Sequence, residues 1–292
     1  MTMPAHTHVL LALLAVLAPF WGALLAGIDR KLTARAQGRI GPPILQPLYD
    51  TIKLLRKEPI VVNRIQIMYA YLHIAFMILA FLLLVLGQDS LMFLFVFAFS
   101  TLSLVLGGMC VRSPYSRIGS QREIMLMVAY EPILILLMIG LYLANGSFLL
   151  GAPLGAGRPM LFSLPLLFVG LLVVIAIKLQ KSPFDLATSH HAHQELVKGL
   201  TIEYSGPYLA ILEIAHFYET AILFFLLMLF WASNLAVGFT LACGCFFLMI
   251  LVDNLFARLT TLWTFRIMWT GVLALALTNV LWLYFRTARP FP

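Results

Sequence analysis

Residues 181–219 read KSPFDLATSHHAHQELVKGLTIEYSGPYLAILEIAHFYE, so a polar stretch leads directly into an apolar run. A charged side chain near the centre of a bilayer costs about 2.5–3.5 kcal/mol on insertion scales. The acidic and histidine side chains of this segment are therefore expected to avoid lipid and to line a protein interior or a wet path. Apolar runs long enough to cross a membrane dominate the rest of the chain.

The composition indicates the class of protein. The 292 residues are 62% hydrophobic and only 11% charged, with a mean hydropathy of +0.98, whereas soluble domains carry about 25% charged residues. We therefore predict an all-α, polytopic membrane protein that forms a single integral membrane domain over residues 1–292. The apolar runs predict about eight transmembrane helices, at roughly 7–28, 66–87, 91–111, 123–145, 162–180, 207–231, 235–254 and 263–285.

Basic residues are distributed unevenly between the two sides of these spans. Sixteen of the nineteen Lys and Arg residues fall on one side, eight of them in the first long loop. The positive-inside rule then places loops 29–65 and 181–206 in the cytoplasm and both termini outside, in a multi-pass protein of the cell inner membrane. Because the basic residues adjoin the membrane rather than gather on a soluble domain, lipid is an expected partner and nucleic acid is not.

The first long loop contains a predicted surface helix. Residues 35–58 read RAQGRIGPPILQPLYDTIKLLRKE, in which the Gly and Pro residues at 38–43 predict an irregular turn. After the turn, Ile44, Leu48, Ile52 and Leu55 recur at helical spacing, which predicts an amphipathic helix of about 15 residues on the cytoplasmic surface. Two interpretations stay open: an interfacial helix that contacts anionic lipid, and a docking platform or cavity rim.

Ionisable residues within or beside the predicted spans have the composition of a proton path. Glu123 and Glu131 are eight residues apart, about 12 Å along one helix face. His216 is three residues from both Glu213 and Glu219. The candidate path comprises Glu123, Glu131, Glu203, Glu213, His216 and Glu219. The alternative interpretation is structural: Glu123 and Asp253 are either solvated or paired with Arg122 and Arg258, respectively. Glu131 has no obvious cation nearby in the sequence.

The sequence predicts no metal site, no catalytic residue and no redox cofactor on this chain. Its three cysteines, Cys110, Cys243 and Cys245, lack the CxxC spacing of zinc and iron–sulfur sites. The histidines at 190, 191 and 193 have no cysteine nearby, so a structural or protonation role is favoured over zinc. His73 is isolated in the sequence and is expected to be an interfacial or packing residue.

Three motifs resemble one family. GRIGP…LQPLYDTIKLLRKE in the first loop, SPFDL…EYSG at 182–206, and Arg122 followed by Tyr130-Glu131 resemble the quinone-site membrane subunit of respiratory complex I, often called subunit 1, and its hydrogenase relatives. The resemblance implies that the long loops face a soluble redox module. The docking and coupling residues would then be Arg39, Gln46, Asp50, Lys53, Arg122, Asp185, His190, His191, His193 and Glu195.

The chain departs from the quinone-reducing members after the PFD turn. Those members carry an acidic run of the form PEAESELVAG, whereas residues 187–199 read ATSHHAHQELVKG and keep only Glu195 before Gly199. This form resembles the membrane subunit of energy-converting, group 4 [NiFe] hydrogenases. Such a subunit would serve an oxidoreductase complex that passes electrons from a low-potential donor such as ferredoxin to protons and translocates H⁺ or Na⁺.

That resemblance also implies the partners. They would be soluble [NiFe] hydrogenase large and small subunits, which hold the Ni-Fe centre and the iron–sulfur clusters, and antiporter-like membrane subunits. The alternative is the quinone-site subunit of a complex I-type NADH:quinone oxidoreductase. A stand-alone ion transporter is disfavoured, because the sequence has no internal repeat.

Overall fold

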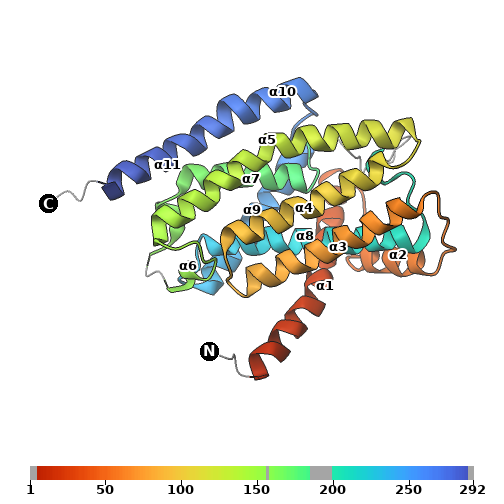
Figure 1. Cartoon of the computed structure of the whole chain (residues 1–292), viewed down its shortest axis with the longest axis horizontal. Helices are drawn as coiled ribbons and strands as arrows, with labels where there is room; N and C mark the ends of the chain where they lie inside the picture. The colour runs from red at the N-terminus through yellow and green to blue at the C-terminus, as the bar shows by residue number, and fades with distance from the viewer. Residues whose placement is uncertain (1–4, 156–157, 185–198, 289–292) are drawn as a thin grey trace. The chain divides into compact units, whose positions relative to one another are not determined.

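Helices make up nearly all the regular secondary structure of the described residues. The computed structural model describes residues 5–155, 158–184 and 199–288, and Figure 1 shows their helices in order. Within those ranges the only β-structure is an isolated antiparallel bridge between Asp89 and Leu149, and no strand forms. The prediction of an all-α fold is confirmed.

Six helical segments among the described residues are long and apolar enough to cross a membrane. They are α3 (Arg64–Val85), α4 (Ser90–Met109), α5 (Pro114–Asn145), α8 (Gly206–Leu229), α9 (Leu235–Leu255) and the run Thr261–Arg286. That last run joins α10 (Thr261–Arg266), a π-helical segment η3 (Ile267–Val272) and the first part of α11 (Leu273–Ala288). The protein is therefore a multi-pass membrane protein.

The other two predicted spans correspond to α1 (Ala5–Ala36) and α7 (Pro165–Lys178). α7 has 14 residues, about 21 Å of helix, and is shorter than the roughly 20 residues that a bilayer requires. It begins at Pro165, which occupies the first helical turn, and ends before Gln180, whose φ is 52°. The count of eight spans stays a prediction.

The predicted surface helix is present as α2 (Gln46–Leu55) and is shorter than expected. Gly38 and Gly41, with φ of 72° and 75°, form the predicted turn before it. α2 contacts α1 and buries Pro47 and Thr51. In its apolar stripe Ile52 and Leu55 are about half exposed, whereas Ile44 and Leu48 are partly buried. The second half of the stripe is thus left exposed for lipid or a partner.

The chain divides into two compact units, each built from three stretches of sequence. The first comprises Met1–Leu86, Phe95–Gln121 and Thr188–Leu223, and includes the short η2 (Gly199–Thr201). The second comprises Gly87–Leu94, Arg122–Ala187 and Phe224–Pro292, and includes the short α6 (Ala152–Gly155) and η1 (Met160–Phe162). The prediction of a single integral domain stays a prediction.

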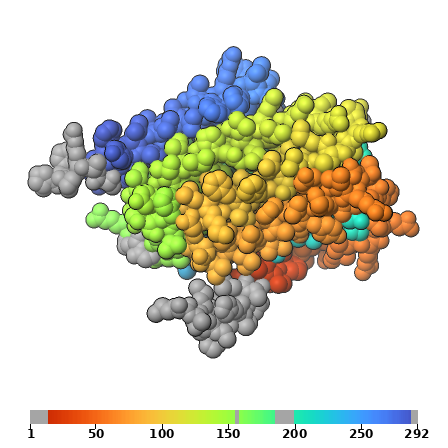
Figure 2. Space-filling view, viewed as in Figure 1, coloured from red at the N-terminus to blue at the C-terminus, as the bar shows by residue number. Residues whose placement is uncertain are grey.

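In the first unit, α3 has one buried and one exposed face. Gln66, Ala70, His73 and Met77 recur at helical spacing and are buried, and Ala70 packs with Tyr204 and Leu212. The other face exposes apolar side chains, and Figure 2 shows this part of the surface in orange. Apolar patches of that kind are disfavoured in water but suited to lipid. The exposed residues are Ile65, Met68, Tyr71 and Leu79.

α1 and α8 approach closely in the same unit. A Cβ atom placed on Gly22 of α1 would overlap the carbonyl oxygen of Phe217 in α8. Small residues of this kind let membrane helices pack backbone against backbone. The hydroxyl of Tyr218 adds a hydrogen bond to the Ala15 carbonyl at 2.8 Å. Gly22 therefore sets how closely α1 packs against the helix that carries His216.

We expect Gly22→Ala to destabilise the protein by about 1–3 kcal/mol, because the added methyl overpacks the α1–α8 contact. Gly244→Ala is the matched control, since Gly244 also lies in a helix and has nothing within 4 Å of an added Cβ. Thermal unfolding of the two purified variants measures the difference. A Gly22→Ala midpoint as high as that of Gly244→Ala would contradict the close approach.

Candidate functional site

A lysine and a glutamate lie near each other inside the second unit. Lys178, at the end of α7, is only 6% exposed, and its Nζ lies 4.8 Å from the centre of the Tyr130 ring on α5. The Lys178 ammonium is also within electrostatic reach of Glu131. We call Tyr130, Glu131 and Lys178 the α5–α7 site. The sequence does not indicate Lys178 as a cation for Glu131, because the two residues are almost fifty positions apart in the chain.

Opposing influences act on the Glu131 carboxyl group in the α5–α7 site. The Oε1 atom of Glu131 is buried and has no hydrogen-bond partner among the described residues. A buried carboxylate without donors is costly, whereas a nearby cation favours the charged form. Pro132, which follows within α5, has no N–H and so removes one helical hydrogen bond at this level. The α5–α7 site is therefore the candidate for an ion-coupling role in the proposed function.

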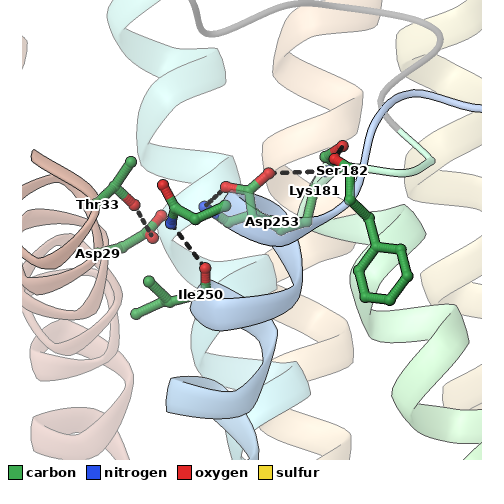
Figure 3. A network of polar contacts seen from close by, with 8 residues as sticks. Asp29, Thr33, Lys181, Ser182, Ile250 and Asp253 are labelled. Atoms are coloured by element: carbon green, nitrogen blue, oxygen red, sulfur yellow. Dashed lines mark hydrogen bonds and ion pairs between the residues drawn. The ribbon is translucent and has the colours of Figure 1, made fainter. Parts of the chain in front are cut away.

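Asp253 fixes the backbone of the SPFDL motif in the second unit (Figure 3). Its carboxylate accepts hydrogen bonds from Lys181 Nζ at 3.1 Å and from the Ser182 amide at 2.8 Å. The Ser182 hydroxyl donates to the Phe256 carbonyl at 2.7 Å, and the Leu259 amide donates to the Pro183 carbonyl at 2.9 Å. We call Lys181, Ser182 and Asp253 the Asp253 anchor.

The anchor is largely removed from solvent. The side chains of Lys181 and Asp253 are 14% and 8% exposed. Asp253 is therefore paired with Lys181 rather than solvated, and the alternative partner named from sequence, Arg258, is not needed to neutralise it. The anchor holds the first half of the SPFDL motif against the end of α9, and Asp185 lies outside the described residues.

In the first unit, α8 carries three of the predicted proton-path residues. His216 Nδ1 lies 3.4 Å from the Glu219 carboxylate, as expected for residues three apart on a helix. Both side chains are largely buried, at 28% and 13% exposed. Glu213 lies on the same helix and is partly exposed. This pair is therefore a second group of ionisable side chains on a candidate span of the described residues.

The EYSG motif ties the start of α8 to the first long loop. Ser205 exchanges hydrogen bonds with the Ile60 backbone at 3.0 and 3.1 Å. Tyr204 is buried and its hydroxyl donates to the Gln66 carbonyl at 3.5 Å. Burial raises the pKa of Tyr204, so its hydroxyl stays protonated. Glu203 is partly buried directly before this attachment.

His73 is a polar residue whose importance the sequence did not reveal. It is buried between α3 and α4, with Nδ1 2.8 Å from both the carbonyl oxygen and the hydroxyl of Ser100. The Ser100 hydroxyl donates to the His73 carbonyl at 2.8 Å. Because a carbonyl oxygen can only accept, the contact between Nδ1 and the Ser100 carbonyl requires Nδ1 to be the donor. His73 is thus a hydrogen-bonded residue within a span rather than an interfacial one.

The predicted docking residues are only partly described. Asp50 accepts from Arg30 at 3.3 Å and from Gln46 at 2.8 Å, which attaches α2 to α1. Arg39 donates to the Gln37 side chain. Lys53 is exposed on α2. Glu123 and Arg122 lie on α5, where Glu123 is partly buried and Arg122 is exposed. The remaining predictions, Asp185, His190, His191, His193 and Glu195, lie outside the described residues.

No group of three or more His, Cys, Asp or Glu side chains within the described ranges could hold a metal ion. Cys110, Cys243 and Cys245 are free thiols there. The predicted absence of a metal and of a redox cofactor from the whole chain stays a prediction.

Six apolar helices among the described residues, and ionisable side chains partly buried among the helices of each unit, are features of a multi-pass membrane subunit. The chain belongs to the NADH dehydrogenase family, the superfamily of complex I subunit 1: the family model described as NADH dehydrogenase matches residues 8–284. This confirms the resemblance drawn from the three motifs.

Known proteins similar to the chain are subunits of respiratory complexes. The H subunit of NADH-quinone oxidoreductase from Bacillus cereus (strain B4264) is 31% identical over 240 residues, covering 72% of this chain and 70% of that protein. The protein of the same name from Bacillus thuringiensis (strain Al Hakam) matches equally, with the same identity and coverage.

A solved structure is also similar over nearly the whole length. It is a chain of the membrane-bound sulfane sulfur reductase, an archaeal respiratory membrane complex, with a TM-score of 0.82 and 26% identity. The match covers 94% of this chain and 98% of that chain. The chain is therefore a membrane subunit of the complex I subunit 1 type, and its relatives work within multisubunit membrane complexes.

Proposed function

We propose that this chain is the membrane-anchor and ion-coupling subunit of a multisubunit, energy-converting [NiFe] hydrogenase. The observation that supports ion coupling is the α5–α7 site, where the partly buried Glu131, with its Oε1 atom buried, lies within electrostatic reach of the buried Lys178. Intramembrane ionisable residues are expensive to bury and commonly mark ion pathways. Electrons would pass from a low-potential donor such as ferredoxin to protons in the partner subunits.

The choice of a hydrogenase rests on the sequence of the second long loop. Histidines stand there in place of the carboxylates of the quinone-reducing pattern, at 190, 191 and 193. In this proposal the chain has eight spans, both termini outside and long cytoplasmic loops. Soluble hydrogenase large and small subunits dock on those loops and carry all redox cofactors, while antiporter-like subunits adjoin the chain in the membrane.

A quinone-reducing complex is the second candidate, and the names of the Bacillus relatives favour it. The similar solved structure belongs to a sulfur reductase, which indicates that subunits of this fold serve complexes with different electron acceptors. Acceptor identity therefore requires a direct test.

The test is purification through a tag on this chain, followed by assays of the recovered complex with a chemically reduced ferredoxin. We expect hydrogen evolution, a Ni-containing large subunit in the preparation, and no effect of quinone-site inhibitors. Reduction of a quinone analogue that such inhibitors block would establish the second candidate instead. Sulfide formation from a sulfane sulfur donor, without hydrogen, would refute the hydrogenase assignment as well.

We expect Arg39→Ala to weaken docking of the soluble subunits at the cytoplasmic face. Arg39 is exposed in the turn before α2, and its guanidinium is available to an acidic partner surface. The yield of soluble subunits recovered with the tagged chain measures the effect. Arg112→Ala is the control, because Arg112 is also exposed but lies between α4 and α5. Unchanged yield and activity for Arg39→Ala would remove this residue from the docking surface.

A further inference from the structure

A cavity with two arginines lies in the second unit, where α5 and α11 end. It has a volume of about 580 Å³ and is bounded by the last turn of α5, the segment at 158–163 and the end of α11. Its lining combines Arg158 and Arg286 with apolar side chains such as Phe162 and Leu283. No acidic residue is among the described residues that line it. The cavity is thus both positively charged and apolar.

One face of α11 builds the wall of this cavity. Asn279, Leu283 and Arg286 follow one another at helical spacing and so lie on one face. Asn279 is buried, and its Oδ1 accepts from the Leu166 and Leu167 amides at 2.9 and 3.1 Å. These amides are at the start of α7, so Asn279 caps that helix from a neighbouring one. The wall is therefore fixed before any ligand binds.

The opposite side of the cavity, formed by the segment at 158–163, is also held by hydrogen bonds. Asn279 Nδ2 donates to the Ser163 carbonyl at 3.1 Å, and the Leu161 amide donates to the Phe230 carbonyl at 3.2 Å. Asn145, at the end of α5, lies 3.8 Å from the Met160 sulfur. Residues 160–163, which follow Arg158, are therefore attached to α5, to α11 and to the residue directly after α8, so this side of the cavity is held in place without a ligand.

We propose that this cavity binds an anionic phospholipid, with the headgroup phosphate between Arg158 and Arg286 and the acyl chains along Phe162 and Leu283. Arginine pairs with phosphate through parallel N–H donors. Arg286 also stacks on Trp282, with its guanidinium carbon 5.3 Å from the ring centre, and tryptophan is typical of the membrane–water boundary. A free phosphate would satisfy the arginines but leave the apolar lining in water, so the lipid is favoured.

The proposal is independent of the electron acceptor of the complex. Its test compares the wild-type complex with the double variant Arg158→Gln/Arg286→Gln and with Arg266→Gln. Arg266 is the matched control, because it lies on the same helical run and stacks on Trp263 at 5.5 Å without lining the cavity. Each complex is stripped with detergent and titrated with fluorescent phosphatidylglycerol or phosphatidylcholine, with and without inorganic phosphate.

We expect the wild type and Arg266→Gln to bind phosphatidylglycerol alike, and the double variant to bind it about tenfold or more weakly. Phosphatidylcholine should bind weakly to all three. If the double variant does not assemble, Arg158→Lys/Arg286→Lys, which keeps the charge but not the paired donors, should still lose several-fold affinity. Equal binding by the double variant and Arg266→Gln, equal affinity for both lipids, or displacement of the lipid by millimolar phosphate would each overturn the proposal.

Discussion

Glu131→Gln is expected to reduce ion translocation by the assembled complex about tenfold or more while electron transfer continues. Glutamine nearly keeps the shape of the side chain but cannot take up a proton, and positioned proton-transfer groups commonly contribute roughly 10²–10⁴ in rate. Ion uptake into proteoliposomes, measured together with the rate of electron transfer, gives the ratio that should fall. Glu58→Gln is the control, because Glu58 is exposed in the first long loop.

Loss of assembly must be separated from loss of coupling, because Glu131→Gln also removes a negative charge near Lys178. Adding Lys178→Met restores charge balance in the α5–α7 site. If the double variant regains assembly but not ion uptake, the proton role of Glu131 stands. Equal losses of assembled complex and of ion uptake in Glu131→Gln, both rescued by Lys178→Met, would refute it.

Asp253→Ala should lower the stability of the protein by about 3–5 kcal/mol, the range for removing one partner of a buried ion pair. Lys181 would then be buried without its carboxylate, and the Ser182 amide would lose its acceptor at 2.8 Å. The midpoint of thermal unfolding of the purified complex measures the loss. Electron transfer should fall with it, because the anchor holds the start of the SPFDL loop.

Asp50→Ala provides the comparison for an exposed ion pair. The side chains of Arg30 and Asp50 are 45% and 43% exposed, and such pairs contribute about 1 kcal/mol or less. The double variant Lys181→Met/Asp253→Leu should recover part of the stability that Asp253→Ala loses, since no unpaired charge remains. An Asp253→Ala midpoint equal to that of Asp50→Ala would show that the anchor is not buried in the assembled complex.

The helical segments could be predicted from sequence because apolar length alone specifies a membrane helix. Their ends were harder to predict. α5 begins at Pro114 rather than near residue 123, because polar residues such as Arg117 and Gln121 extend the helix outside the apolar run. α7 is shorter than its apolar run, because Pro165 starts it and Gln180 adopts a positive φ after it. A hydropathy profile shows neither the polar extension of α5 nor the backbone turn that ends α7.

The candidate groups could be predicted singly, and as pairs only where both members lie on one helix. Glu131 and the pair of His216 with Glu219 were identified because charge is rare within apolar runs and because helical spacing is regular. The partners of Glu131 and Asp253 come from α7 and the residues directly after it, and sequence separation gives no hint of that proximity. Lys178 and Lys181 were counted only as basic residues at a cytoplasmic boundary, although both are largely buried.

The most direct test of ion coupling uses the purified wild-type complex in sealed proteoliposomes, supplied with a reduced low-potential donor on the side of the long loops. Electron transfer should build an H⁺ or Na⁺ gradient across the vesicle membrane, and an ionophore for that ion should accelerate electron transfer by relieving the gradient. Electron transfer that builds no gradient and does not respond to ionophores would contradict the assignment of this chain as an ion-coupling subunit.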